Sequence, residues 1–223
     1  GVVLRLQRSE ENLKSWIKYR SDIWRYDGAE EPLRRMANTN SNLYAYRFDW
    51  DEQNNSSFAG NYQLFVGAAH GLEIPFLTGD FDLGPITFYI KPFMFPDDSD
   101  EGRLALSDLM MTYWANIAKY GNPNEFVKGP KWEKFTQENN QLLILDNPTA
   151  NLVEMRTIPV NKEELLSQIE ADSALEIKER CLIGWIAAQN FQEDARPQPP
   201  FNFCSNFNEE DLYKLRNLTE GRD

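Results

Sequence analysis

Apolar and polar residues alternate along residues 43–50, and one of the two faces is aromatic. The side chains that share this face are Tyr44, Tyr46, Phe48 and Trp50. Aromatic-rich runs with period two are typical of strands, and such a stripe usually marks burial in a core. We therefore expect residues 43–50 to form a strand that leads into the polar segment 51–61.

Residues 99–120 carry the clearest helical pattern of the chain. Apolar side chains recur there at three-and-four spacing: Leu106, Leu109, Met110, Tyr113, Trp114 and Ile117. Asp98 and Glu101 have the spacing of a capping box, and Gly121 supplies a left-handed stop. The pattern predicts a scaffold helix with a capping box at its start.

Two further segments have a helical pattern. Residues 9–36 start at a possible cap, Ser9, and we expect the helix to break at Asp27-Gly28 and then resume. Apolar residues predict another helix over residues 162–186. The stretch beyond Pro197 is polar, and we expect it to be peripheral.

Residues 77–97 are rich in glycine, proline and phenylalanine, which favours an irregular loop. Such a loop can line a substrate cavity, where Phe81 and Phe88 would contact the acyl or alcohol group of a ligand. Each ring can equally anchor the loop. Phe93 and Phe95 of the same segment could make such contacts too, and Phe81 and Phe88 are taken as the candidates for substrate binding.

Composition narrows the classes of function. The chain has 223 residues, of which 41% are hydrophobic, and it can bury one substantial core. A net charge of -12 argues against nucleic acid and anionic membranes as partners. No apolar run is long enough for a transmembrane segment. Cys181 and Cys204 can form one disulfide or remain two buried thiols, and with one histidine they do not make a metal site.

His70 is the single histidine of the chain, and small residues surround it in Gly67-Ala68-Ala69-His70-Gly71. Small neighbours leave the imidazole accessible at the tip of a loop. Histidine exchanges protons near neutral pH and can act as a general base, although a loop histidine can also serve packing alone. Because His70 follows the end of a predicted strand, where α/β folds gather functional groups, we interpret it as a catalytic candidate.

Several stretches occur in an order that matches a known family. They are residues 44–50, the Gly-Ala-Ala-His-Gly-Leu-Glu-Ile-Pro-Phe run of residues 67–76, the helix end that closes with Gly-Asn-Pro-Asn in residues 113–124, and residues 132–136 with 142–146. Together they resemble the type-B carboxylesterases, the cholinesterase-like family of the α/β-hydrolase superfamily. Residues 67–76 resemble the segment that carries the catalytic histidine of that family.

The resemblance implies an α/β fold in which residues 1–223 are the C-terminal part of one α/β-hydrolase domain. Late sheet strands and packing helices would be completed by an N-terminal part. It also implies carboxylic ester hydrolysis by a Ser-Glu/Asp-His triad with His70 as the general base. The nucleophile motif G-x-S-x-G does not occur in the sequence, so nucleophile, acid and oxyanion hole would come from the N-terminal part. Glu73 can be considered as the acid, but the family takes its acid from upstream, so we expect Gly71 and Glu73 to shape the site.

This chemistry requires no cofactor and no metal ion. The expected partners are the N-terminal part of the same esterase, on a separate chain, and a small-molecule ester. N-glycosylation triplets and the cysteine pair favour an extracellular or periplasmic location. The alternative is a non-catalytic, cholinesterase-like module for interaction or adhesion, because a fold does not fix a function.

Overall fold

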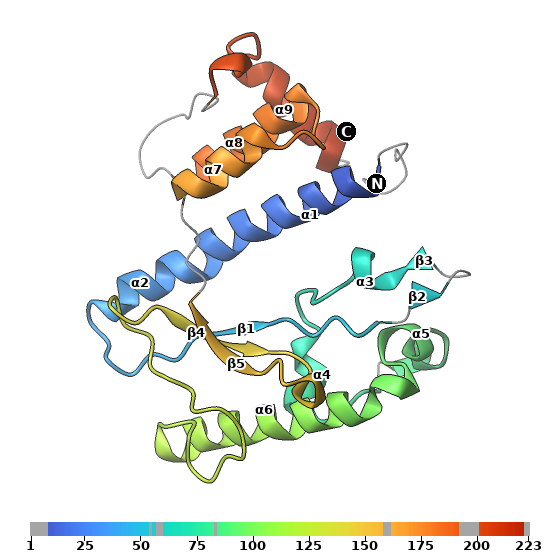
Figure 1. The fold of residues 1–223 in the computed structure, drawn as a ribbon, viewed down its shortest axis with the longest axis vertical. Coiled ribbons are helices and arrows are strands. Elements are labelled where there is room, and N and C mark those ends of the chain that lie inside the picture. The colour runs from blue at the N-terminus through green and yellow to red at the C-terminus, as the bar shows by residue number, and fades with distance from the viewer. Residues whose placement is uncertain are drawn as a thin grey trace. The chain divides into compact units, whose positions relative to one another are not determined.

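The computed structural model describes residues 9–53, 55–56, 60–82, 84–157, 162–191 and 201–220 (Figure 1). The chain divides into two compact units. Leu33–Ile158 form one unit, and Gly1–Pro32 with Pro159–Asp223 form the other. The first unit mixes helices and strands, and the regular elements described in the second are helices. In the part of the chain that the structure describes, no helix is both long and apolar enough to cross a membrane.

A three-stranded sheet with the order β1-β4-β5 forms the centre of the mixed unit. Strand β1 (Tyr46–Phe48) pairs in parallel with β4 (Gln141–Leu145), and β4 pairs in antiparallel fashion with β5 (Glu154–Thr157), as Figure 1 shows. A separate two-stranded sheet joins β2 (Asn55–Ser56) to β3 (Gly60–Asn61). The chain is thus a mixed α and β structure, as the strand and helix patterns predict.

The regular part of β1 is shorter than the expected strand over residues 43–50, but pairing with β4 extends beyond it. The backbone N–H of Leu143 donates to the carbonyl of Ala45 over 2.9 Å. At the other end, Asp49 N–H donates to the carbonyl of Leu145, also over 2.9 Å. The extended chain therefore runs past both ends of β1, and the residues that follow it remain close to the carboxyl end of β4, where Glu52 contacts Asn147.

Alternation along β1 and β4 divides their side chains between two apolar clusters. One cluster contains Phe48, Trp50, Leu143 and Leu145. The other contains Ala45, Leu142 and Ile144 with Phe135. Successive side chains of a strand point to opposite faces, so both faces of the sheet are covered. The predicted alternation is confirmed, although Tyr46 keeps 37% of its surface exposed.

Helix α6 (Asp100–Tyr120) covers the larger cluster, and Gly121 ends it in the left-handed conformation with φ 67°, as predicted. The buried face of the helix contains Leu106, Met110 and Tyr113, each 0% exposed. The predicted capping box is wrong, because a 3-10 turn, η4 (Asp97–Ser99), precedes the helix and Ser99 takes the N-cap position. The Ser99 hydroxyl donates to the carbonyl of Pro96 instead of capping α6.

The expected irregular loop over residues 77–97 is wrong in part. Helix α4 (Glu73–Thr78) enters this region, and η3 (Gly84–Ile86) leads into helix α5 (Thr87–Met94). Pro92 lies inside α5 and removes one backbone donor. The turn nevertheless continues, because Phe95 N–H donates to Lys91 O over 2.8 Å and Phe95 is 1% exposed. Burial of apolar side chains offsets the loss at the proline.

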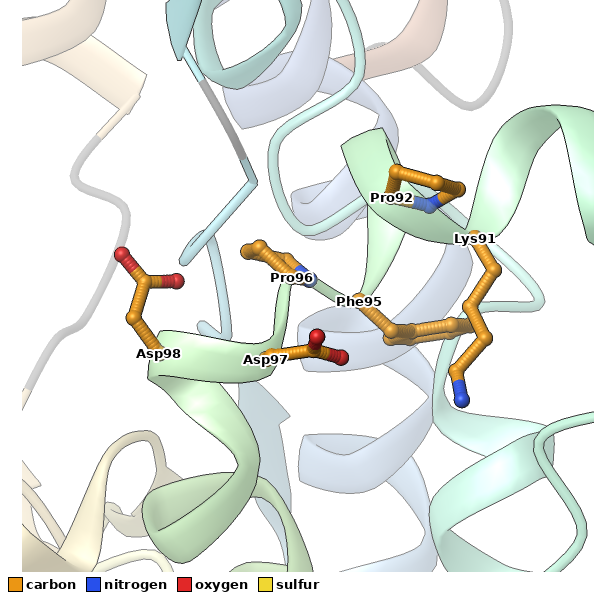
Figure 2. Close-up of a pocket in the computed structure, with 6 residues that line it drawn as sticks. All are labelled: Lys91, Pro92, Phe95, Pro96, Asp97 and Asp98. Carbon is orange, nitrogen blue, oxygen red and sulfur yellow. The ribbon is translucent and has the colours of Figure 1, made fainter.

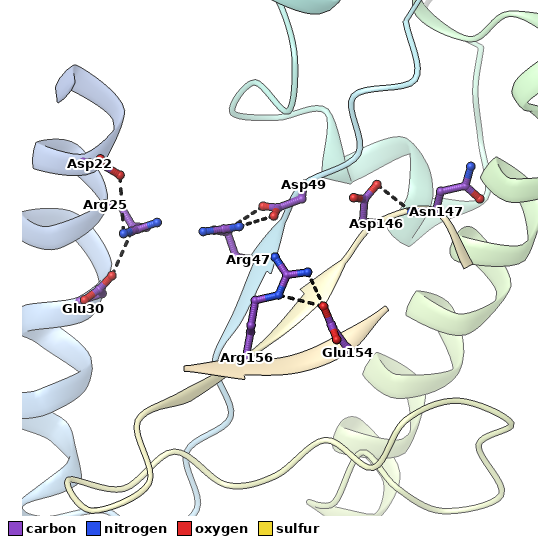
Figure 3. A network of polar contacts seen from close by, with 9 residues as sticks. All are labelled: Asp22, Arg25, Glu30, Arg47, Asp49, Asp146, Asn147, Glu154 and Arg156. Carbon is purple, nitrogen blue, oxygen red and sulfur yellow. Dashed lines mark hydrogen bonds and ion pairs between the residues drawn. The ribbon is translucent and has the colours of Figure 1, made fainter. Parts of the chain in front are cut away.

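In the helical unit, α1 (Glu10–Arg25) starts as predicted, with the Ser9 hydroxyl accepting the N–H of Asn12 over 3.2 Å. The predicted break at Asp27-Gly28 is wrong. A π-helical turn, η2 (Tyr26–Glu30), carries the chain directly into α2 (Glu31–Ala37). Glu30 is buried on this turn and forms an ion pair with Arg25 Nε at 2.9 Å (Figure 3). The π-helical turn thus buries Glu30, which lies close to the predicted break.

The single helix predicted for residues 162–186 is two helices, α7 (Lys162–Ala171) and α8 (Ile177–Phe191). Side chains stabilise the bend between them. The Asp172 carboxylate accepts the N–H of Ala174 over 2.8 Å, and the Glu179 carboxylate accepts the N–H of Glu176 over 2.9 Å. These carboxylates satisfy backbone groups that a continuous helix would have satisfied itself.

The expectation of a peripheral tail is wrong for its described part, residues 201–220. Cys204 and Cys181 form a disulfide that joins the turn η6 (Asn202–Cys204) to α8, which settles the choice between disulfide and thiols. Helix α9 (Glu209–Glu220) follows, and its Leu212 is 0% exposed. Phe201 and Leu212 pack into the same core as Tyr19 and Ile23 of α1. Two apolar anchors and a covalent bond therefore hold this segment, whose average composition is polar. Pro197 lies outside the described residues.

Reduction of the disulfide should destabilise the helical unit. The bond closes a loop between residues 23 positions apart, for which chain entropy gives about 3 kcal/mol. Thermal unfolding followed by circular dichroism should show a Tm lower by roughly 10 °C in dithiothreitol. The double variant Cys181→Ala with Cys204→Ala serves as the control, because its Tm should already be low and should not respond to the reductant. A wild-type Tm that is insensitive to full reduction would contradict the disulfide.

Candidate functional site

The loop that carries His70 connects α3 (Tyr62–Phe65) to α4 (Glu73–Thr78). His70 is exposed at its tip. Gly67 has φ 50° and Gly71 has φ 90°, both in the left-handed region that favours glycine. Leu72 N–H donates to the carbonyl of Ala69 over 3.1 Å and closes a turn around the histidine. The small residues on either side of His70 therefore permit the tight conformation that presents its ring.

Glu73 lies at the start of α4 and braces the C-terminal side of this loop. Its Oε2 atom accepts the backbone N–H of Gly71 over 2.9 Å, and Ile74 N–H donates back to Gly71 O over 3.3 Å. A carboxylate in the first turn of a helix also interacts favourably with the helix dipole. The two residues that sequence reasoning assigned to shaping the site, Gly71 and Glu73, are thus brought together by a hydrogen bond.

Gln53 braces the N-terminal side of the same loop. Its Nε2 atom donates to the carbonyl of Gly67 over 2.9 Å, and the side chain is 95% buried, with 5% of the residue exposed. Sequence reasoning missed this residue, because no motif surrounds it and a glutamine in a polar segment gives no sign of burial. The contact connects the chain that follows β1 to the histidine loop.

Helix α4 is held against α6 by aromatic packing and one buried hydrogen bond. Phe76 is 0% exposed, and the Ser107 hydroxyl donates to its carbonyl over 2.8 Å. The ring of Phe81 packs edge-on against Phe76, with centroids 5.1 Å apart, and the guanidinium of Arg103 lies 4.2 Å from the Phe81 centroid. The substrate-binding candidate Phe81 is therefore part of the packing that fixes α4.

Phe88, the second substrate-binding candidate, lies on α5 and is 84% exposed. Its ring contacts that of Tyr89 edge-on, with centroids 5.5 Å apart. Near the end of the same helix is an open hollow of about 320 Å³ (Figure 2), lined by Lys91, Pro92, Phe95, Pro96, Asp97 and Asp98. The structure thus separates the two candidates into one packed ring and one exposed ring.

Carboxylates gather where the parallel strands β1 and β4 end (Figure 3). Asp49 follows β1 and forms an ion pair with Arg47, while Asp146 follows β4 and accepts the N–H of Asn147 over 2.7 Å. The Asn147 side chain donates to Glu52 over 2.9 Å. Among the described residues, no group of three or more His, Cys, Asp or Glu side chains is arranged to hold a metal ion.

Burial and mutual repulsion perturb this group of carboxylates. The pKa of Asp146 is raised to about 6, chiefly by burial, with smaller contributions from the charges of Asp51, Asp49 and Glu52 and against the hydrogen bond from Asn147. Burial also raises the pKa of Asp51, which a hydrogen bond from Gln63 opposes. Perturbed carboxyl groups often mark functional regions, although structural clusters produce the same shifts.

Comparison with known proteins shows the family of the chain. The sequence profile described as the Carboxylesterase family matches residues 4–163, and the chain belongs to this family. It is 32% identical to acetylcholinesterase of Gallus gallus over 103 residues, or 46% of this chain and 11% of that protein. It is 28% identical to bile salt-activated lipase of Homo sapiens over 158 residues, or 69% of this chain and 19% of that protein.

Neuroligin-3 of Macaca mulatta is also similar, with 40% identity over 68 residues, which is 30% of this chain and 30% of that protein. The matched part of the chain therefore covers less than a third of the length of each of these relatives.

Replacement of Asp146 by Asn should stabilise the protein at neutral pH. The folded-state pKa of about 6 lies above the ordinary value of 3.8, so the folded protein binds more protons between these values. Stability is then lost as pH rises from about 4 to about 6 and stays low above that range. Asp146→Asn removes this cost and retains an oxygen that accepts the N–H of Asn147.

The measurement is the Tm of Asp146→Asn and wild type from pH 4 to pH 8. The variant should gain a few degrees relative to wild type as pH rises through about 6. Glu138→Gln removes the same charge at an exposed position, and its Tm difference should stay flat. A flat difference for Asp146→Asn as well would show that Asp146 titrates normally.

Proposed function

We propose that the protein hydrolyses carboxylic esters and that His70 is its general base. The observation that carries the proposal is the position of the chain's single histidine, exposed on a loop that Gln53 and Glu73 brace, in a member of the carboxylesterase family. A general base must be accessible to its proton donor and held in a fixed direction. An exposed ring on a braced loop meets both requirements.

In this mechanism a serine hydroxyl attacks the ester carbonyl while His70 accepts its proton. The imidazolium then protonates the leaving alkoxide, and a second cycle with water releases the carboxylic acid. Glu73 is not assigned as the orienting acid, since its carboxylate already accepts the N–H of Gly71. Its proposed role, with Gly71, is to shape the loop.

The nucleophile, the acid and the oxyanion hole come, in this proposal, from an N-terminal part of the same esterase. Two observations support it. The chain matches less than a third of the length of its relatives. Among the described strands, β1 lies at one end of the order β1-β4-β5, so its free edge can pair with a further strand. Residues 1–223 would then be the C-terminal part of one α/β-hydrolase domain.

The proposed substrate is a small-molecule ester, and the chemistry uses no cofactor. Phe88 is the better candidate for contact with it, because its ring is 84% exposed whereas Phe81 is committed to packing on Phe76. The disulfide between Cys181 and Cys204 supports an extracellular or periplasmic location, where such bonds persist.

The second candidate function is a non-catalytic module for interaction or adhesion. The observation that favours it is the similarity to neuroligin-3, whose name denotes no hydrolase, unlike the names acetylcholinesterase and bile salt-activated lipase. A fold alone does not decide between these roles. An accessible His70 favours hydrolysis, since adhesion does not need a proton acceptor.

Replacement of His70 by Gln in the intact protein should abolish ester turnover. Loss of the base leaves the serine without proton removal, so kcat for a short-chain aryl ester should fall by about 10⁴-fold or more. Labelling by a fluorescent fluorophosphonate should slow in parallel.

Lys128→Gln changes an exposed position of the same unit and serves as the control, with activity equal to wild type. Near-normal turnover in His70→Gln would remove His70 from the mechanism. An intact protein that neither hydrolyses esters nor takes up the label would favour the adhesion module.

A further inference from the structure

Gln53 is a buried polar side chain outside every motif of the sequence, and it contacts the loop of His70. We propose that Gln53 is a positioning residue for His70, which fixes where that loop begins. The inference rests on the proposed function and deepens it, because it names a residue that acts on the general base through the backbone. The hydrogen bond from Gln53 Nε2 to Gly67 O, at 2.9 Å, is its starting point.

The segment that carries Gln53 is itself anchored at successive residues. Trp50 is 0% exposed in the apolar cluster against α6. Asp51 accepts a hydrogen bond from the side chain of Gln63 in α3, and Glu52 accepts one from Asn147 Nδ2 over 2.9 Å. A side chain can orient its neighbour only when its own backbone is fixed, and here core packing and two polar contacts fix it.

Asn147 has little freedom to move in this network. A Cβ atom added at Gly102 of α6 would lie 2.3 Å from Asn147 Oδ1, so the amide packs directly on the helix backbone. The same oxygen accepts the N–H of Thr149 over 3.1 Å. Helix α6 therefore limits the position of Asn147, which in turn holds Glu52 next to Gln53.

Gly67 lies at the start of the loop that carries His70, so a change in its conformation displaces the histidine. Its φ of 50° permits the chain to reverse direction, and His70 follows three residues later. Glycine has several accessible conformations, so an external contact is needed to select one. Misplacement of a catalytic group by about 1 Å can cost about 10²-fold in rate. The hydrogen bond to Gly67 O thus restrains the start of the loop that carries His70.

The chemistry of the glutamine amide suits this role. A neutral NH₂ group donates to a carbonyl without bringing a charge into a region already rich in carboxylates. The Oε1 atom of Gln53 is buried with no hydrogen-bond partner among the described residues. A methionine at this position would keep the length and volume, delete one donor and remove the unpaired acceptor. The fold should survive the change, because removal of the unpaired acceptor offsets part of the cost of leaving Gly67 O without its donor.

The test compares Gln53→Met with wild type in the intact protein by hydrogen–deuterium exchange and steady-state kinetics. Backbone amides of residues 66–72 should exchange about tenfold faster, while peptides of α6 should remain unchanged. The kcat for an ester should fall by about 10- to 100-fold with KM within about twofold, because the base loses its position and the binding surface is intact. Gln137→Met removes a glutamine donor at an exposed site that bonds Asn38, and it should change neither quantity.

Exchange of residues 66–72 in Gln53→Met that equals wild type would overturn the proposal, whatever the kinetics show. Faster exchange with unchanged kcat would also overturn it, because the loop would then be released without effect on the base. Failure of the proposed function is seen separately, as full activity in His70→Gln. In that case the exchange experiment still reports whether Gln53 orders the loop.

Discussion

The parallel pairing of β1 with β4 is the constraint on which the mixed unit depends. It sets Tyr46 against Leu143 and Phe48 against Leu145, residues nearly a hundred positions apart in the sequence. Parallel strands lack a short connection, so the intervening chain must cross back over the sheet. That crossover contains α6, which covers one face, and the loop of His70. The register also decides which side chains reach each apolar cluster, because a shift by one residue would exchange the two faces.

The same pairing brings the carboxyl ends of both strands to one edge, where several acidic side chains meet. Burial and the neighbouring carboxylates both raise the pKa of Asp146, so the charged form of this group is unfavourable there. The fold offsets the repulsion locally through the ion pair of Asp49 with Arg47 and through the amide groups of Asn147 and Gln63. These contacts also fix the chain that leads from β1 toward the histidine loop. The same few side chains therefore reduce the repulsion between the carboxylates and hold the chain that leads to the histidine loop.

Local patterns predicted the elements that depend on local physics. The alternation around Phe48, the stripe of α6 and the stop at Gly121 are properties of neighbouring residues, and the structure has all three. The buried segment around Cys204 depends on contacts with distant residues, namely the disulfide to Cys181 and packing against α1, which a short window of sequence does not contain. For the site, the glycines around His70 predicted an accessible loop. The support from Gln53 could not be predicted, because it is a contact between a side chain and a backbone carbonyl 14 residues away.

Burial of Gln53 is better explained by control of the loop than by stability. A buried amide oxygen without a partner costs about 1–3 kcal/mol, whereas one neutral hydrogen bond returns about 1 kcal/mol. An apolar side chain at residue 53 would avoid that cost and fill the same space. What it would not supply is a donor for Gly67 O, at the start of a loop whose glycines leave it free to adopt other conformations. A loop that only connected α3 to α4 would not need this donor. A loop that holds His70 as the proposed general base does need it, because the rate of proton transfer depends on the orientation of the imidazole.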